Sequence, residues 1–338
     1  MKRNNFGTVA AQAAARLRAI NYDALPLSDY NKRYIRAMLP AMEYYMKIFA
    51  HCLHRGIRAV ALQPAAITLI DYGGGSGFLS ILAKEAGFGQ VIYIDLNPLS
   101  VETIEVLKRQ TGAGPDVILQ GDAGVLTDYC RAHKVSPHLL IATDLIEHVY
   151  DPASFFAALC TINRRMQLIF TTASSPFNPL TKRRLHRFMK DCESGEAVSP
   201  HYLARREAFI RRHYPHFSPE QTSLWSRCTR GLTYDDIRKA IDSGSLPLPA
   251  DPHNTCDPET GNWAERILPL RAYRAFLDPH DYTLSVGKGF YNTRRSLLPF
   301  SLICRFLNLL IRYSGPAGLW LSPFIVLWCK PPKENRLE

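Results

Sequence analysis

The chain has 338 residues, of which 46% are hydrophobic and 21% are charged. This length and balance suit one large domain or two small ones with a sizeable core, and they exclude a wholly disordered chain, collagen and a disulfide-stabilised miniprotein. The net charge of +11 raises nucleic acid or an anionic membrane surface as partners but establishes neither. The charge is uneven: residues 1–64 carry +7, residues 65–150 carry −5 and residues 151–338 carry +9.

Eight cysteines are scattered along the chain without any CxxC pair or clustered spacing. This argues against a zinc ribbon or a disulfide framework and favours a reducing compartment. We therefore expect a cytoplasmic protein, with peripheral membrane contact left open. The basic N-terminus has an alanine-rich run interrupted by Gln12, Arg16 and Arg18, which predicts a helix rather than a secretory signal; an amphipathic transit peptide is the alternative.

Helical spacing of apolar residues predicts helices over residues 8–62, with Pro40 near one helix start. Short apolar, β-branched runs then alternate with helical segments as far as residue 172. The alternation predicts βαβ units and a mostly parallel sheet with right-handed crossovers. We expect strands over residues 67–70, 91–95, 117–122, 139–144 and 166–172, and helices over residues 78–87, 98–109 and 152–163.

The alternation lapses after the fifth strand. Residues 174–265 are polar, basic and rich in His and Pro, which predicts an inserted region of helices and loops, with residues 251–263 as a surface loop. Two basic runs within it are either solvated helix faces or sites for phosphate groups, anionic lipid or RNA. The runs contain Lys182, Arg183, Arg184, Arg187 and Lys190, and then Arg205, Arg206, Arg211 and Arg212.

Two further strands are expected near the C-terminus, over residues 282–291 and 323–330. Apolar runs cover residues 297–311 and 317–329, but Arg305 and Pro323 interrupt them, so neither supplies the roughly 20 apolar residues that a membrane span needs. We expect a buried helix followed by a buried strand. The alternative is an interfacial helix that dips into lipid.

The segment from Asp71 to Gly77, DYGGGSG, follows the first strand and opens a helix. It has no Lys-Ser/Thr pair after the last glycine, which excludes a phosphate-binding loop. The dinucleotide pattern GxGxxG fails whether it starts at Gly73 or at Gly75, which argues against NAD. The pattern that fits is D-x-G-x-G-x-G, with the acid and alternate glycines in phase.

On this motif the chain resembles the class I S-adenosylmethionine-dependent methyltransferases. The resemblance implies a Rossmann-like α/β fold with a seven-stranded, mostly parallel sheet, helices on both faces and an antiparallel last strand. It implies S-adenosyl-L-methionine as cofactor and S-adenosyl-L-homocysteine as product. We expect residues 1–64 to form a helical arm or lid, 65–173 the cofactor-binding core, 174–270 a substrate insertion, and 271–338 the last strands with a hydrophobic helical segment.

Acids stand at four successive strand ends, and one such Asp alone would be read as a helix N-cap. Because these acids follow a glycine turn, the resemblance gives each of them a role. It implies that Asp95, after the second strand, holds the ribose hydroxyls, and that Asp122 and Ala123, after the third strand, contact adenine. It implies that Asp144, after the fourth strand, flanks the methyl group. The expected cofactor-binding residues are Asp71, Gly73, Gly74, Gly75, Gly77, Asp95, Leu96, Asp122, Ala123 and Asp144.

The segment from Asp144 to Pro152, DLIEHVYDP, is similar to the D/E-x-x-E-H-x-x-D-P stretch of the ubiquinone-biosynthesis O-methyltransferases. We expect His148, with Glu147, to act as base or to orient the acceptor; a structural histidine bonded to a neighbouring loop is the alternative. Asp144, Glu147 and His148 together are also compatible with a divalent metal, which we do not expect. Asp151 and Pro152 predict the next helix start.

These patterns predict an enzyme that moves a methyl group to an oxygen or nitrogen of a small-molecule or lipid-linked acceptor. An RNA methyltransferase is one alternative, motivated by the charge, although no RNA-binding motif accompanies it. A non-catalytic protein that binds the cofactor or acts as an interaction module is the other. The oligomeric state is not indicated by the sequence.

Overall fold

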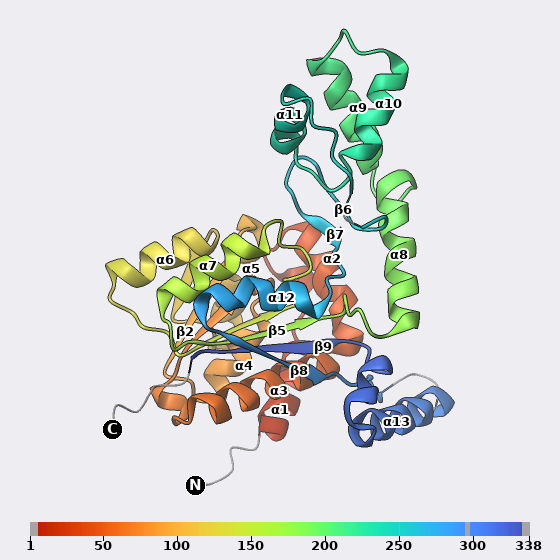
Figure 1. The fold of residues 1–338 in the computed structure, drawn as a ribbon. Coiled ribbons are helices and arrows are strands. Elements are labelled where there is room, and N and C mark those ends of the chain that lie inside the picture. The colour runs from red at the N-terminus through yellow and green to blue at the C-terminus, as the bar shows by residue number, and fades with distance from the viewer. Residues whose placement is uncertain (1–5, 250, 295–297, 333–338) are drawn as a thin grey trace, which may run out of the picture.

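The computed structural model describes residues 6–249, 251–294 and 298–332 (Figure 1). Seven strands form one sheet in the order β3-β2-β1-β4-β5-β9-β8, in which β9 runs antiparallel to both neighbours and the other pairs are parallel. This confirms the predicted fold class. The strands are β1 Thr68–Tyr72, β2 Gln90–Asp95, β3 Val117–Gln120, β4 Leu139–Thr143, β5 Gln167–Thr172, β8 Thr283–Lys288 and β9 Ile325–Lys330.

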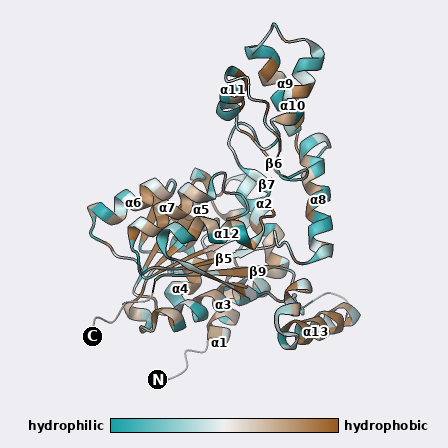
Figure 2. Ribbon diagram, in the orientation of Figure 1, coloured by the Kyte–Doolittle hydropathy of each residue, from teal (hydrophilic) through white to brown (hydrophobic). Residues whose placement is uncertain are grey.

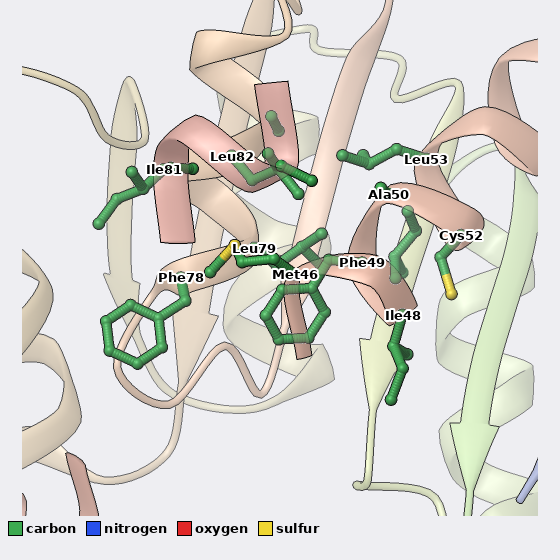
Figure 3. Packing of buried hydrophobic residues seen from close by; sticks show 14 of the residues in the cluster. Met46, Ile48, Phe49, Ala50, Cys52, Leu53, Phe78, Leu79, Ile81 and Leu82 are labelled. Carbon is green, nitrogen blue, oxygen red and sulfur yellow. The ribbon is translucent and has the colours of Figure 1, made fainter. Parts of the chain in front are cut away.

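The central strands are apolar runs with almost every residue buried, as expected for a sheet that is covered on both faces. One core lies between the sheet and the helices α1 Phe6–Arg18, α3 Met42–Val60, α4 Phe78–Glu85 and α5 Pro98–Thr111. In Figure 3, Met46 and Phe49 of α3 pack against Phe78 and Leu79 of α4. The other core lies beneath α6 Ala123–Ala132, α7 Pro152–Ile162 and α12 Leu270–Leu277.

The predicted N-terminal helical region contains three α-helices, because polar caps and prolines divide it. Ser28 caps α2 Asp29–Met38 by accepting the N–H of Asn31, and Pro40 lies in a short 3-10 turn just before α3. Helices α1 and α3 belong to the main core, and α2 joins it through Ile35 and contacts α5 near the carboxyl ends of the strands. The 3-10 turns are η1 Tyr22–Ala24, η2 Leu39–Ala41, η3 Pro64–Ala66, η4 Asp278–His280 and η5 Gly315–Trp320.

Between β5 and α12 the chain leaves the sheet and forms a separate lobe that projects from it (Figure 1). The lobe has its own small apolar cluster of Ile210, Ile237 and Ile241. It contains the predicted helices and also a short hairpin that the sequence did not reveal. Its elements are α8 Pro179–Ser194, α9 Tyr202–His213, α10 Pro219–Cys228, α11 Tyr234–Asp242, β6 Thr255–Cys256 and β7 Trp263–Glu265.

Arg206 corrects the interpretation of the second basic run as a solvated or ligand-binding face. Its side chain is fully buried, pairs with both carboxylate oxygens of Glu193 and donates to the Ser226 carbonyl. The Thr255 hydroxyl donates a further hydrogen bond of 2.7 Å to Glu193. This ion pair therefore ties α8, α9 and β6 together inside the lobe.

We expect Arg206→Ala to lower the free energy of unfolding of the lobe by about 3–5 kcal/mol, because Glu193 would be left buried without its cation. Hydrogen exchange of the amides in α8 and α9 measures this directly. Arg212→Ala, on the exposed face of the same helix, is the matched control and should change the free energy by less than about 0.5 kcal/mol. Equal protection in both variants would contradict the assignment.

Helix α13, Leu298–Tyr313, overturns the expectation of a buried helix. Among its residues only Ser301, Cys304 and Ile311 are buried, and Figure 2 shows it as a strongly apolar helix beside the sheet. Leu297, where we expected the apolar run to begin, lies outside the described residues. The strand that follows, β9, is buried as expected. No helix within the described ranges is long and apolar enough to cross a bilayer.

Candidate functional site

The turn between β1 and α4 explains the phase of the glycines. Gly73, Gly75 and Gly77 have φ angles of 65°, 53° and 73°, in the left-handed region that favours glycine. The Gly73 N–H donates to the Ile94 carbonyl at 2.8 Å, and the Tyr93 hydroxyl donates to the Gly75 carbonyl at 2.6 Å. The turn is thus held against β2, at the sheet edge where the strand order reverses and where open α/β sheets bind ligands.

Asp71 and Gly77 support this turn from behind and line neither of the cavities described below. The Asp71 carboxylate accepts hydrogen bonds from the Ser80 N–H and hydroxyl at 3.0 and 2.7 Å, and burial raises its pKa to about 7. A Cβ atom on Gly77 would lie 2.1 Å from the Ile104 side chain. Both residues therefore shape the turn by packing and hydrogen bonding.

The larger cavity, of about 840 Å³, lies beyond the ends of β2 and β3. Asp95, at the end of β2, accepts the N–H groups of Gly75 and Asn97 at 2.8 Å each, and burial raises the pKa of Asp95. The Leu96 side chain beside it is 71% exposed and offers an apolar surface to the cavity. The cavity therefore suits a ligand that presents polar groups to Asp95 and a flat apolar face to Leu96.

Asp122 and Ala123 line the same cavity from the end of β3. Asp122 also caps α6, because its Oδ1 accepts the N–H groups of Gly124 and Val125 at 2.9 and 3.3 Å. Asp122 therefore both caps a helix, as a lone aspartate would, and lines the cavity. Asp151 and Pro152 likewise start α7 as predicted, with Asp151 as the N-cap.

His148 lines the larger cavity and is fixed by the lobe. Its Nδ1 lies 2.8 Å from the Trp263 carbonyl oxygen of β7. A carbonyl can only accept, so Nδ1 carries a hydrogen and Nε2 is the nitrogen left to accept a proton in the neutral ring. The geometry therefore contains the predicted bond to a neighbouring segment and leaves one nitrogen available for chemistry.

A smaller cavity of about 280 Å³ lies on the other side of the turn and shares Gly73 with the larger one. Tyr34 of α2 and Tyr45 of α3 form its outer wall, and Gly74, Gly75 and Asp144 form its inner wall. A Cβ atom on Gly75 would meet little besides the Tyr34 hydroxyl, 3.8 Å away. The backbone of the turn is therefore open to a ligand at this point.

Two polar side chains of the smaller cavity are available to a ligand. The Ser76 Oγ is buried and has no hydrogen-bond partner among the described residues. Asp144 is held at a φ of 50°, unusual outside glycine, and its side chain is open to this cavity. Loss of hydration in the cavity and the nearby Glu265 raise the pKa of Asp144 to about 6, while His148 acts in the opposite direction. Such a cavity suits a ligand with polar and cationic groups.

Glu147 lies beneath the site and lines neither cavity. Its side chain is buried, and its Oε2 has no hydrogen-bond partner in the part of the chain that the structure describes. Burial together with Asp144 raises the pKa of Glu147 well above the usual range. Among the described residues, no group of three or more His, Cys, Asp or Glu side chains is arranged to hold a metal ion.

Several lining residues were missed or misjudged from the sequence. Tyr34 and Tyr45 belong to no motif, but both line the smaller cavity, whereas Tyr44 donates a hydrogen bond to the Phe290 carbonyl. The segment 260–262, expected in a surface loop, lines the larger cavity. Ser76 could have been predicted as a lining residue, because it is the polar residue inside the glycine turn.

The chain matches no known protein-family model. It is 23% identical over 216 residues to a ubiquinone biosynthesis O-methyltransferase of Methylobacterium sp. strain 4-46, covering 64% of this chain and 74% of that protein. It is 57% identical over 41 residues to a ribosomal protein L11 methyltransferase of Burkholderia mallei, covering 12% of this chain and 13% of that one. A solved S-adenosylmethionine-dependent methyltransferase from Clostridium acetobutylicum is similar over 90% of this chain and 100% of its own, at 10% identity and a TM-score of 0.45.

Proposed function

We propose that this chain, a class I S-adenosylmethionine-dependent methyltransferase, moves a methyl group to an oxygen or nitrogen of a small-molecule or lipid-linked acceptor. The observation that carries the proposal is the placing of Asp95, Asp122 and Asp144 around two cavities that meet at one glycine turn. An elongated ligand with a nucleoside at one end and a charged amino acid at the other would fill both cavities.

The larger cavity would take the adenosyl end. Asp95 is placed at the end of β2, where a carboxylate can accept hydrogen bonds from ribose hydroxyls. Leu96 supplies an exposed apolar surface for the adenine ring. Asp122 and Ala123, from the next strand end, would meet the edge of that ring.

The smaller cavity would take the methionyl end. The open backbone at Gly75 allows close approach, and the Ser76 hydroxyl, unpaired among the described residues, would gain a partner. The Asp144 carboxylate would stabilise positive charge on the ligand. These residues supply the polar and anionic groups that a zwitterionic cationic ligand requires.

When bound, the cofactor supplies a methyl group on a positively charged sulfur that already leaves readily, so the protein has to position the acceptor and remove its proton. His148 is suited to the second task, since its Nδ1 is held by the Trp263 carbonyl and its Nε2 can accept a proton. Tyr34 and Tyr45, which belong to the N-terminal helices, would narrow the approach to the smaller cavity.

Formation of S-adenosylhomocysteine by the purified full chain, followed with phenolic, amine, lipid-linked and RNA acceptors in parallel, tests the proposal. Turnover with a phenol or amine that greatly exceeds the cofactor's background hydrolysis is the expected result. Turnover confined to RNA, with binding that weakens steeply as salt rises, would overturn the acceptor assignment.

We expect the affinity for S-adenosylmethionine to fall as the pH is lowered from 7 to 5. The pKa of Asp144 is about 6, and a bound cation lowers it, so below pH 6 binding requires loss of a proton. The affinity should decrease by at most about tenfold per pH unit in that range and stay level above it. Calorimetry at several pH values measures this.

Asp144→Asn is the control for this pH dependence, because asparagine tolerates the left-handed backbone and does not titrate. The variant should bind more weakly at pH 7 and lose most of the slope between pH 6 and 5. Asp95 and His148 also face the ligand, so an unchanged slope in the variant would assign the pH dependence to them and contradict the role of Asp144.

A further inference from the structure

Helix α13 turns its apolar side outward. Its outward-facing side chains are between 37% and 74% exposed, and the neighbouring Trp320 is 58% exposed. Monomeric soluble proteins rarely expose so many large apolar groups together. The exposed set is Leu298, Phe300, Leu302, Ile303, Phe306, Leu309, Leu310 and Tyr313.

The inward side of the same helix contains Ser301, Cys304, Asn308 and Ile311, and the hydrogen bonds on this side fix the helix in its orientation. Asn308 accepts the Tyr291 N–H at 2.7 Å and donates to the Tyr291 carbonyl at 3.0 Å. Lys288 donates to the carbonyls of Arg312 and Gly315, near the end of the helix. Because these bonds hold the Asn308 side of the helix against β8 and the segment after it, the apolar side faces outward.

The charges that α13 and its neighbours in the chain carry are all positive. The sequence has no Asp or Glu between Asp281 and Glu334, and Arg305 and Arg312 are exposed on the helix itself. The basic run of α8 starts close by, because Asn178 at the cap of α8 donates to the Ser322 carbonyl at 3.0 Å. Its members Lys182, Arg183, Arg184, Arg187 and Lys190 are all exposed.

The face lies at the same edge of the sheet as the two cavities. β8 runs parallel to the central strands and leads into α13 from its carboxyl end, where the cavities open. The segment between them contacts α3, since the Tyr44 hydroxyl donates to the Phe290 carbonyl and Arg294 pairs with Glu43. The next residue of α3, Tyr45, lines the smaller cavity.

We propose that α13 is an interfacial helix that seats the enzyme on an anionic lipid bilayer, with the smaller cavity next to the membrane surface. The exposed Leu, Ile and Phe side chains enter the acyl boundary, Tyr313 and Trp320 lie at headgroup level, and the arginines meet anionic headgroups. This inference rests on the proposed function in one respect: it adds that the methyl acceptor reaches the site from the membrane. The positive charge of α13 and of the basic run of α8 favours an anionic bilayer over an apolar protein surface.

Vesicle flotation of the full chain tests the inference. We expect the protein to float with phosphatidylcholine vesicles that contain 30% phosphatidylglycerol (roughly physiological anionic content) and to float much less with pure phosphatidylcholine. The double variant Ile303→Ser/Phe306→Ser should lower partitioning by about tenfold or more. Arg305→Gln/Arg312→Gln should lower it by a similar factor on anionic vesicles alone.

Leu224→Ser/Leu248→Ser removes two exposed leucines from the projecting lobe and is the matched control, which should float like the unaltered chain. No flotation with anionic vesicles, or equal flotation of the Ile303/Phe306 variant, overturns the inference. A dimer that dissociates in that variant, without flotation, would assign the face to a second copy and also overturn it. Calorimetry with S-adenosylmethionine on the same samples separates this failure from a failure of the proposed function, because all three double variants should keep cofactor affinity.

Discussion

Replacing Asp95 by alanine is expected to lower the affinity for S-adenosylmethionine by roughly 100- to 1,000-fold. In the proposed binding mode the change removes two charge-assisted hydrogen bonds to the ribose, each worth about 1.5–2 kcal/mol. It also releases the Gly75 N–H, which Asp95 now holds at 2.8 Å, so the glycine turn becomes less well ordered. Both effects act on binding, and calorimetric titration of the purified variant measures them together.

Asp128→Ala is the matched control, because Asp128 is an exposed aspartate on α6 that pairs with Arg131 and lines neither cavity. It should bind the cofactor as the unaltered chain does. Asp95→Asn separates the two effects, since its amide oxygen can still accept the Gly75 N–H while the charge is lost. An Asp95→Ala variant that stays folded and binds within threefold of the unaltered chain would contradict the ribose assignment.

The second large effect is expected on the rate rather than on binding. With an acceptor that turns over, His148→Ala should lower kcat by about 10²- to 10³-fold, the usual contribution of a positioned general base. The dissociation constant for S-adenosylmethionine should change by less than about threefold, because the proton leaves the acceptor and not the cofactor.

His133→Ala provides the control for His148. The His133 Nδ1 also lies near a backbone carbonyl, that of Tyr129 at 3.0 Å, but the residue is exposed at the end of α6 and lines neither cavity. Its removal should leave kcat unchanged. If His148→Ala retains kcat and loses only acceptor affinity, the residue orients the acceptor and is not its base.

The sheet and the glycine turn were predictable because their signals are local. Buried strands appear as β-branched runs, and the alternate glycines mark the left-handed positions of one turn. The acids at strand ends could be placed at one sheet edge for the same reason. Asp71 shows where this reasoning stops: it follows the same pattern but lies buried beneath the turn, bonded to Ser80.

The rest of the site depends on contacts between distant segments, which a single sequence does not specify. Tyr34 and Tyr45 reach the smaller cavity only because α2 and α3 fold over the turn, and residues 260–262 reach the larger one only because the lobe folds back. Composition also could not tell which side of α13 faces the protein. Asn308 decides this through its two hydrogen bonds to Tyr291.

Calorimetric titration of the full chain with S-adenosylmethionine, and separately with NADH, tests the cofactor assignment most directly. We expect a single site with a dissociation constant in the micromolar range for the sulfonium cofactor, and no heat of binding for NADH. Binding of NADH, or a folded chain that takes up no S-adenosylmethionine, would contradict the assignment of the two cavities to this cofactor.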